Sequence, residues 1–176
     1  MKITICGLAG TGTSTTGKKL ASVLEYEFIS SGGIFRAKAA EYGMDLHEFE
    51  DLCRSDEKYD RAVDDEIATI GKSKDDIVVE SRLAWYFIPD SFKVLLVCDR
   101  HTRVSRVAGR DKISRSEADQ KTAHREDSIR ARFRDYYGIE QFDDEANFDL
   151  VLDTTKVSVS STVDSIAKKL SELHST

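Results

Sequence analysis

The sequence predicts an α/β fold, in which helices cover both faces of a parallel β-sheet of the P-loop NTPase type. Short runs rich in isoleucine and valine predict strands at Lys2–Cys6, Asp76–Val79, Phe92–Cys98 and Asp149–Leu152. These runs do not alternate strictly between apolar and polar residues, which is typical of strands buried on both faces. Stretches of helical length separate the runs, and strands that alternate with helices form a parallel sheet.

The elements follow one another in that pattern along the chain. A glycine-rich loop follows the first strand, and apolar residues at spacings of three and four then predict a helix over Ser14–Glu25. A weaker strand candidate lies at Glu27–Ile29. The stretch Val159–Leu173 has one apolar stripe, which predicts a helix after the last strand.

Two long stretches exceed what a βαβ unit needs. Gly33–Lys74 has a helical pattern with a break at residues 42–45, and Arg100–Asp144 is highly charged. Within the second stretch we expect a polar segment at residues 111–119 between two helices. Both stretches look like insertions over the carboxyl ends of the strands, where open α/β sheets bind their ligands.

The composition excludes several classes of protein. The chain has 176 residues, the size of one domain, and 40% of them are hydrophobic, which is enough for a core. No apolar run could span a bilayer, so we expect no membrane partner. An odd number of cysteines without metal-type spacing (Cys6, Cys53 and Cys98) favours reduced thiols in a cytoplasmic protein, and we expect a monomer.

The loop after the first strand is predicted to bind phosphates. Its residues are Gly7, Leu8, Ala9, Gly10, Thr11, Gly12, Thr13, Ser14 and Thr15. Glycines let backbone N–H groups turn inward around an anion, and the N-terminus of the following helix adds unpaired donors. The spacing of Gly7, Gly12 and Ser14 matches a P-loop, in which Ser14 would bind Mg²⁺. The alternative is a surface turn rich in glycine and threonine.

Thr13 occupies the position at which a P-loop carries lysine. Either nucleotide binding is degraded in this chain, or a different cation serves the β- and γ-phosphates. We favour a replacement by arginines, because arginine binds phosphate bidentately and threonine cannot neutralise its charge.

Arginines are concentrated in one segment of an acidic protein. The net charge of −6 argues against binding to nucleic-acid polymers, yet residues 100–134 hold nine arginines and two lysines against five acidic residues. Five of these arginines have helical spacing: Arg103, Arg106, Arg110, Arg125 and Arg132. The first three share one helix face and the last two share another. Either neighbouring acids neutralise them, or a polyanion lies between two arginine-bearing helices, as in phosphoryl transfer.

Further polar residues follow the second and third strands. We expect Ser31 and the two glycines after it to form a loop, with Arg36 on the first turns of the next helix. Glu80 ends the third strand, where a carboxylate beside a P-loop can hold Mg²⁺-bound water. Arg82 would face the same crevice.

The order of these motifs resembles that of the nucleoside monophosphate kinases, and in detail that of the archaeal-type cytidylate kinases. The matching stretches include Gly32-x-Ile34-Phe35-Arg36, Tyr42-Gly43-Met44-x-Leu46, Val78-Val79-Glu80-x-Arg82-Leu83, Tyr136-Tyr137-Gly138-Ile139 and Asp149-Leu150-Val151-Leu152-x-Thr154. The resemblance covers nearly the whole chain, and that family commonly has threonine in place of the P-loop lysine. It implies one kinase domain over residues 1–176, with an acceptor-binding insertion at residues 33–71 and a lid at about residues 110–125.

The resemblance implies Mg²⁺-dependent transfer of the γ-phosphoryl group of ATP to CMP or dCMP. Gly7 to Thr15 would wrap the ATP phosphates, Arg106 would lie near the adenine, and Ser14 with Glu80 would hold the metal. On the acceptor side, the resemblance assigns five residues, which are Ser31, Arg36, Asp60, Asp64 and Arg82. Asp60 and Asp64 would read a base amine, although an acidic solvated helix face is an equal alternative. Three arginines would serve the transferring phosphoryl group: Arg110, Arg125 and Arg132.

Two other functions stay open from the sequence. One is a kinase for another acceptor, such as AMP or UMP, although adenylate kinases usually carry Gly-Phe-Pro-Arg where this chain has Ser81-Arg82-Leu83. The other is a nucleotide-binding regulatory protein that lost catalysis together with the P-loop lysine.

Overall fold

The computed structural model of the chain describes residues 1–174, with side chains through residue 173. Five parallel strands form one sheet in the order β2-β3-β1-β4-β5. They are β1 (Lys2–Gly7), β2 (Glu27–Ser30), β3 (Ile77–Glu80), β4 (Phe92–Val97) and β5 (Leu150–Asp153). Each predicted strand, including the weaker candidate, is confirmed to within one residue at either end.

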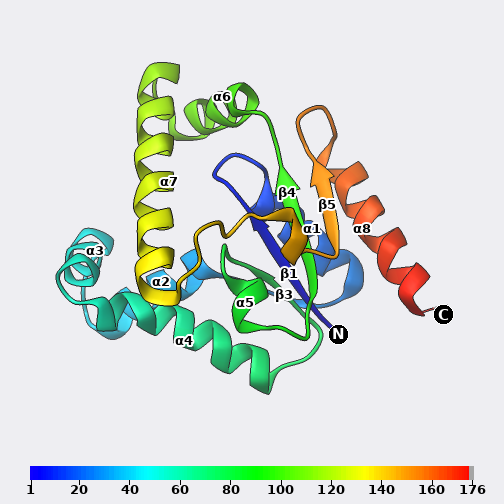
Figure 1. Cartoon of the computed structure of the whole chain (residues 1–176), viewed down its shortest axis with the longest axis horizontal. Coiled ribbons are helices and arrows are strands. Elements are labelled where there is room, and N and C mark those ends of the chain that lie inside the picture. The colour runs from blue at the N-terminus through cyan, green and yellow to red at the C-terminus, as the bar shows by residue number, and fades with distance from the viewer. Residues whose placement is uncertain (175–176) are drawn as a thin grey trace.

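Helices cover both faces of this sheet, as the unalternated strands predict. On one face, α1 (Thr13–Leu24) and α8 (Val159–His174) pack against Ile3 and Ile5 of β1 through Leu20 and Ile166. The other face is covered by α4 (Glu57–Ser73), the short α5 (Ala84–Phe87) and α7 (Arg115–Tyr137). Figure 1 shows β1 at the centre, with α8 on one side and α4, α5 and α7 on the other.

The two long stretches are helical insertions, as predicted. After β2 come α2 (Ser31–Glu41), α3 (Leu46–Ser55) and α4, and the predicted break is real because Gly43 has φ +67° and Asp45 caps α3. After β4 come α6 (Arg100–Asp111) and α7, followed by a short 3₁₀ turn at Glu145–Asn147. Both insertions therefore begin at carboxyl ends of strands, and they stand together on one side of the molecule (Figure 1).

Two local expectations are wrong. The glycines after Ser31 do not form a loop, because the Ser30 hydroxyl accepts a hydrogen bond from the N–H of Gly33 at 3.1 Å and starts α2 at Ser31. The polar segment expected at residues 111–119 is also shorter. Only residues 112–114 separate α6 from α7, because the Ser114 side chain caps α7 through the N–H of Glu117.

Between residues 1 and 174, no helix combines the length and the apolar character that a membrane span requires. The longest helix, α7, has 23 residues and is rich in charged side chains.

Candidate active site

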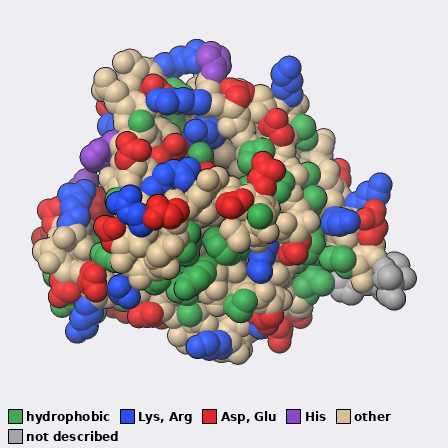
Figure 2. All heavy atoms as spheres, in the orientation of Figure 1, with side chains coloured by type: hydrophobic (Ala, Val, Ile, Leu, Met, Phe, Trp, Pro, Cys, Tyr) green, Lys and Arg blue, Asp and Glu red, His purple; other side chains and the backbone are tan. Residues whose placement is uncertain are grey.

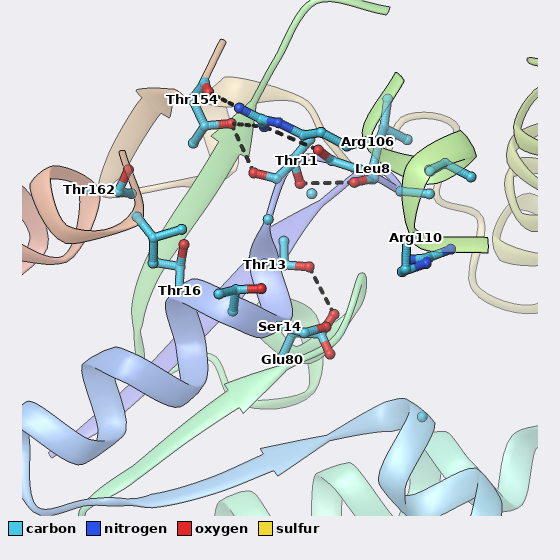
Figure 3. A pocket seen from close by; sticks show the side chains of 18 of the residues that line it. Leu8, Thr11, Thr13, Ser14, Thr16, Glu80, Arg106, Arg110, Thr154 and Thr162 are labelled. Atoms are coloured by element: carbon cyan, nitrogen blue, oxygen red, sulfur yellow. Dashed lines mark hydrogen bonds between the residues drawn. The ribbon is translucent and has the colours of Figure 1, made fainter. Parts of the chain in front are cut away.

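A cleft of about 920 Å³ opens at the carboxyl ends of the strands. Its floor is the glycine-rich loop, residues 7–16, and its walls come from both insertions and from the loop that follows β5 (Figure 3). The sequence-predicted residues that line it together are Ser31, Arg36, Glu80, Arg82, Arg106, Arg110 and Arg125. Residues as far apart in the sequence as Gly7 and Arg125 thus meet in one cavity.

The loop has the backbone of an anion-binding site. Gly10 and Gly12 have φ values of +88° and +92°, which side-chain-bearing residues rarely adopt. The Thr11 hydroxyl donates to the carbonyl of Leu8 at 2.8 Å and closes the turn. Helix α1 then begins with no side-chain cap and no acidic residue in its first turn. Its first N–H groups therefore lack acceptors within the helix and remain available to a phosphate.

Arg103 of α6 supports this loop from behind. Its side chain is only 7% exposed, and Nη1 donates to the carbonyl of Ala9 at 3.2 Å and to Glu126 Oε1 at 2.6 Å. The backbones also touch, since a Cβ atom at Gly10 would lie 2.6 Å from the carbonyl oxygen of Arg103. The sequence placed Arg103 on a basic helix face but gave no signal for this contact.

Arg106, predicted to lie near the adenine, lines the cleft beside the loop. Its Nη1 donates to the carbonyl of Gly10 at 3.2 Å and its Nη2 to the carbonyl of Thr154 at 2.7 Å. Thr154 is buried, and its hydroxyl donates to the carbonyl of Thr11 at 2.8 Å. Arg106 and Thr154 thus join the loop to α6 and to the end of β5 (Figure 3). Sequence analysis did not find this role of Thr154, because its partners lie far away in the chain.

Ser14 and Glu80 fit the predicted metal site. Both line the cleft, and the hydroxyl of Thr13, next to Ser14, donates to Glu80 Oε1 at 3.0 Å. Figure 3 shows Ser14 beside this hydrogen bond. Hydroxyl, carboxylate and water oxygens together with phosphates are the ligands that Mg²⁺ prefers, so the residues present are suited to that ion.

Most arginines of the basic segment are neutralised by neighbouring acids. The ion pairs are Arg100–Asp119, Arg103–Glu126, Arg110–Asp111, Arg130–Asp143, Arg132–Asp60 and Arg134–Asp135, at 2.6–3.4 Å. For these residues the interpretation of the sequence in which acids balance the arginines is correct in this structure. Figure 2 shows the mixture of basic and acidic side chains over α6 and α7.

Four arginines of the cleft have no carboxylate partner in the described residues, and one of them, Arg106, donates to backbone carbonyls instead. Across residues 1–173, no carboxylate lies within ion-pair distance of Arg36, Arg82 or Arg125. Burial lowers the pKa of Arg82 to about 10, and the charge of Arg125 acts in the same direction. The Arg82 Nε atom is also buried without a hydrogen-bond partner in the described part of the chain. Arg82 is half-buried and Arg36 and Arg125 are exposed, so three positive charges without acidic partners line a cleft that has room for an anion.

Asp60, Asp64 and Arg132 lie outside the cleft lining, between α4 and α7. Arg132 donates to Asp60 at 2.6 Å, and Asp64 accepts a hydrogen bond from the Tyr137 hydroxyl at 2.9 Å. Burial raises the pKa of both carboxyl groups. The structure therefore contradicts the alternative of an acidic solvated helix face for these two residues, because both carboxylates are held by α7.

Comparisons with known proteins find relatives over nearly the whole chain. The model of the cytidylate kinase-like family matches residues 2–156. A cytidylate kinase from Methanosarcina mazei is 40% identical over 93% of this chain and 93% of its own length. An S-adenosylmethionine-dependent nucleotide dehydratase from Lacinutrix mariniflava is 33% identical over 94% of this chain, which spans only 35% of that relative.

The fold also occurs in solved kinases. Shikimate kinase from Acinetobacter baumannii superposes with a TM-score of 0.65 over 97% of this chain and 93% of its own, at 16% sequence identity. This likeness confirms the predicted P-loop fold. The relatives confirm that the enzyme is an ATP-dependent nucleoside monophosphate kinase. From the match over most of its length, the chain belongs to the cytidylate kinase-like family.

Proposed function

We propose that this protein transfers the γ-phosphoryl group of ATP to CMP or dCMP in a Mg²⁺-dependent reaction, which yields ADP and CDP or dCDP. The observation that carries the proposal is the set of three arginines, Arg36, Arg82 and Arg125, around a cleft that the P-loop also lines. Within residues 1–173 their guanidinium groups have neither a carboxylate partner nor, unlike Arg106, a carbonyl partner. The names of the archaeal relatives support cytidylate as the acceptor.

The donor side of the cleft is the better defined. In this proposal residues 7–15 surround the phosphates of ATP with backbone N–H groups, and Arg106 lies beside the adenine. Ser14 and Glu80 would hold Mg²⁺, which neutralises phosphate charge when it is bound. The cations that replace the P-loop lysine would be Arg110 and Arg125, which reach the cleft from α6 and α7. Arg110 would exchange its partner Asp111 for a phosphate oxygen.

The acceptor would enter from the other insertion. Arg36 and Arg82 come from the starts of the segments after β2 and β3, so they would bind the acceptor phosphate, with Ser31 at the start of α2 beside it. Asp60 and Asp64 would accept hydrogen bonds from the base amine, and Arg132 and Tyr137 hold these carboxylates in place. Movement of α7 toward the cleft would release Arg132 from Asp60 and bring it to the transferring phosphoryl group.

Catalysis in this arrangement is a matter of position and charge. Arg110 and Arg125 would face the equatorial oxygens of the γ-phosphoryl group, where arginines stabilise the transition state. No general base is required beyond the acceptor phosphate itself, whose oxygen is already an anionic nucleophile. Closure of α6 and α7 over the cleft would exclude water and prevent hydrolysis of ATP.

A substrate panel tests the proposal directly. Release of ADP from ATP and Mg²⁺ is measured with CMP, dCMP, UMP and AMP as acceptors, and Arg100→Ala, which changes an exposed ion pair, is the control protein. Turnover that is fastest with CMP or dCMP supports the proposal. Turnover that is fastest with AMP or UMP identifies a kinase for another acceptor. Tight binding of ATP without turnover of any acceptor supports the regulatory alternative.

A monomeric, cytoplasmic enzyme is part of the proposal. Cys6, Cys53 and Cys98 are free thiols in the structure, as a reducing compartment requires. Light scattering on the purified chain measures the oligomeric state.

A further inference from the structure

We infer that Thr13 is a positioning residue, whose hydroxyl group orients the Glu80 carboxylate toward the Mg²⁺ that accompanies the nucleotide. The residue at this position of a P-loop is usually a lysine that contacts phosphate. The inference rests on the proposed function for the presence of the metal. It adds that Thr13 has a role of its own, which differs from that of the usual lysine.

The two branches of the Thr13 side chain have different neighbours. A Cβ atom at Gly7 would lie 2.9 Å from Thr13 Cγ2, so the methyl group packs directly on the glycine that ends β1. The hydroxyl group, on the other branch, donates to Glu80 Oε1 at 3.0 Å. Glu80 ends β3, the strand next to β1 in the sheet. The side chain therefore bridges the ends of two neighbouring strands.

This arrangement fixes the rotamer of Thr13. A β-branched side chain has few χ1 choices, and here the methyl contact with Gly7 selects the one that aims the hydroxyl at Glu80. Gly7 makes this possible, because any side chain at that position would collide with the methyl group. Packing thus holds the hydrogen bond between the start of α1 and the end of β3.

The hydrogen bond from Thr13 leaves the second carboxylate oxygen of Glu80 available to a metal ion or to a metal-bound water. Thr13 occupies Oε1, and across residues 1–173 no other group donates to Glu80 Oε2. Ser14, the predicted metal ligand, is the next residue after Thr13 and lies on the same side of the cleft (Figure 3). A neutral hydroxyl orients the carboxylate while leaving its charge intact. A lysine ammonium at the same place would pair with Glu80 and compete with the cation.

Isosteric variants test the inference. Thr13→Val keeps both branches, and so the contact with Gly7, but removes the hydroxyl, whereas Thr13→Ser keeps the hydroxyl. Thr13→Ala is a second deletion of the hydroxyl in case valine does not fold, and Thr69→Val, which changes an exposed threonine of α4, is the control. The measured quantity is the factor by which Mg²⁺ strengthens binding of a non-hydrolysable ATP analogue, by calorimetry with and without the metal.

We expect Thr13→Val to reduce this factor by about 10-fold or more, which is the usual effect of removing a partner of a metal-binding side chain. Binding without metal should stay the same, and Thr13→Ser and Thr69→Val should both behave as the unaltered protein. In a Glu80→Gln background Thr13→Val should have no further effect, because the two residues act through one bond. If Thr13 had only a structural role, Thr13→Val would weaken Mg²⁺-dependent binding by the same factor with Glu80 or with Gln at position 80.

Two results would overturn the inference. One is an unchanged Mg²⁺ factor in both Thr13→Val and Thr13→Ala, and the other is a loss in Thr13→Ser as large as that in Thr13→Val. Both results differ from those expected if the proposed function fails. If it fails, Mg²⁺ does not strengthen binding of the ATP analogue to the unaltered protein, or the unaltered protein does not phosphorylate a pyrimidine monophosphate.

Discussion

Arg125 illustrates how far the environment of one side chain decides its role. It lines the cleft without an ion-pair partner between residues 1 and 173, whereas Arg100, on the neighbouring helix, pairs with Asp119 on the surface. We expect Arg125→Ala to lower kcat by about 10³-fold or more, because arginines at transferring phosphoryl groups contribute roughly 10³–10⁵ in rate. Arg100→Ala should change kcat less than about two-fold, since exposed pairs contribute little. Steady-state kinetics with CMP measures both, and equal effects would remove Arg125 from the site.

Asp64 makes stability depend on pH in an unusual direction. Burial raises its pKa above 3.8, so between that value and its folded pKa the folded protein binds a proton that the unfolded chain does not bind. The free energy of unfolding therefore falls as the pH rises through this window. The Asp64→Asn variant has no carboxyl group at this position, so its free energy of unfolding should not fall in this way. Urea titrations should therefore show that the variant gains stability relative to the unaltered protein as the pH rises. Thr69→Val, an exposed change on the same helix that involves no carboxyl group, is the control.

Among single residues, the sequence could identify the P-loop but not the pairing of charges. Gly7, Gly12 and Ser14 lie within eight positions of one another, so local spacing was enough to predict their role. Arg132 and Asp60 are 72 positions apart, and only the packing of α7 against α4 brings them together. Sequence spacing also could not separate most of the paired arginines from Arg36, Arg82 and Arg125. The acids that pair with Arg100, Arg103, Arg130 and Arg132 come from other elements.

At the scale of elements, the pair Arg103–Glu126 ties α6 to α7 and to the P-loop. The pair is largely buried, with 7% and 20% of the two side chains exposed. Glu126→Ala leaves the Arg103 charge buried without its partner, and we expect a loss of about 3 kcal/mol in the free energy of unfolding. Asp119→Ala breaks the exposed Arg100–Asp119 pair between the same two helices and should lower the free energy of unfolding far less. Urea unfolding followed by circular dichroism compares the two, and equal losses would contradict the prediction.

The elements differ in how well their sequences predict them. Strands are confirmed closely because isoleucine and valine runs between polar residues mark them clearly. Helix starts are less certain, as Ser30 and Ser114 show. A capping serine and a loop serine look alike in sequence, and the difference lies in whether the next turn continues. For this reason residues 115–119 of the expected polar segment belong to α7.

On the scale of the whole molecule, the charge distribution separates the cleft from the rest of the surface. The chain carries −6 in total, yet the cleft is lined by five arginines and two acidic residues. We expect the KM values for ATP and CMP to rise with NaCl, because the Debye length shrinks from about 10 Å at 0.1 M to about 3 Å at 1 M salt. The value of kcat should change less. Sucrose at equal osmolality is the control, and KM values independent of salt would show that steering by this field is absent.

The contact between Gly10 and Arg103 has a consequence for inhibitors. A methyl group at Gly10 would lie 2.6 Å from the carbonyl oxygen of Arg103 and 2.9 Å from its Cα atom, so a larger residue would push α6 off the loop. A compound that binds the backbone N–H groups of this loop uses contacts that a change of side chain does not remove. Selection for resistance would therefore act on positions that the chain can exchange freely, such as Val157, which is 43% exposed at the rim of the cleft.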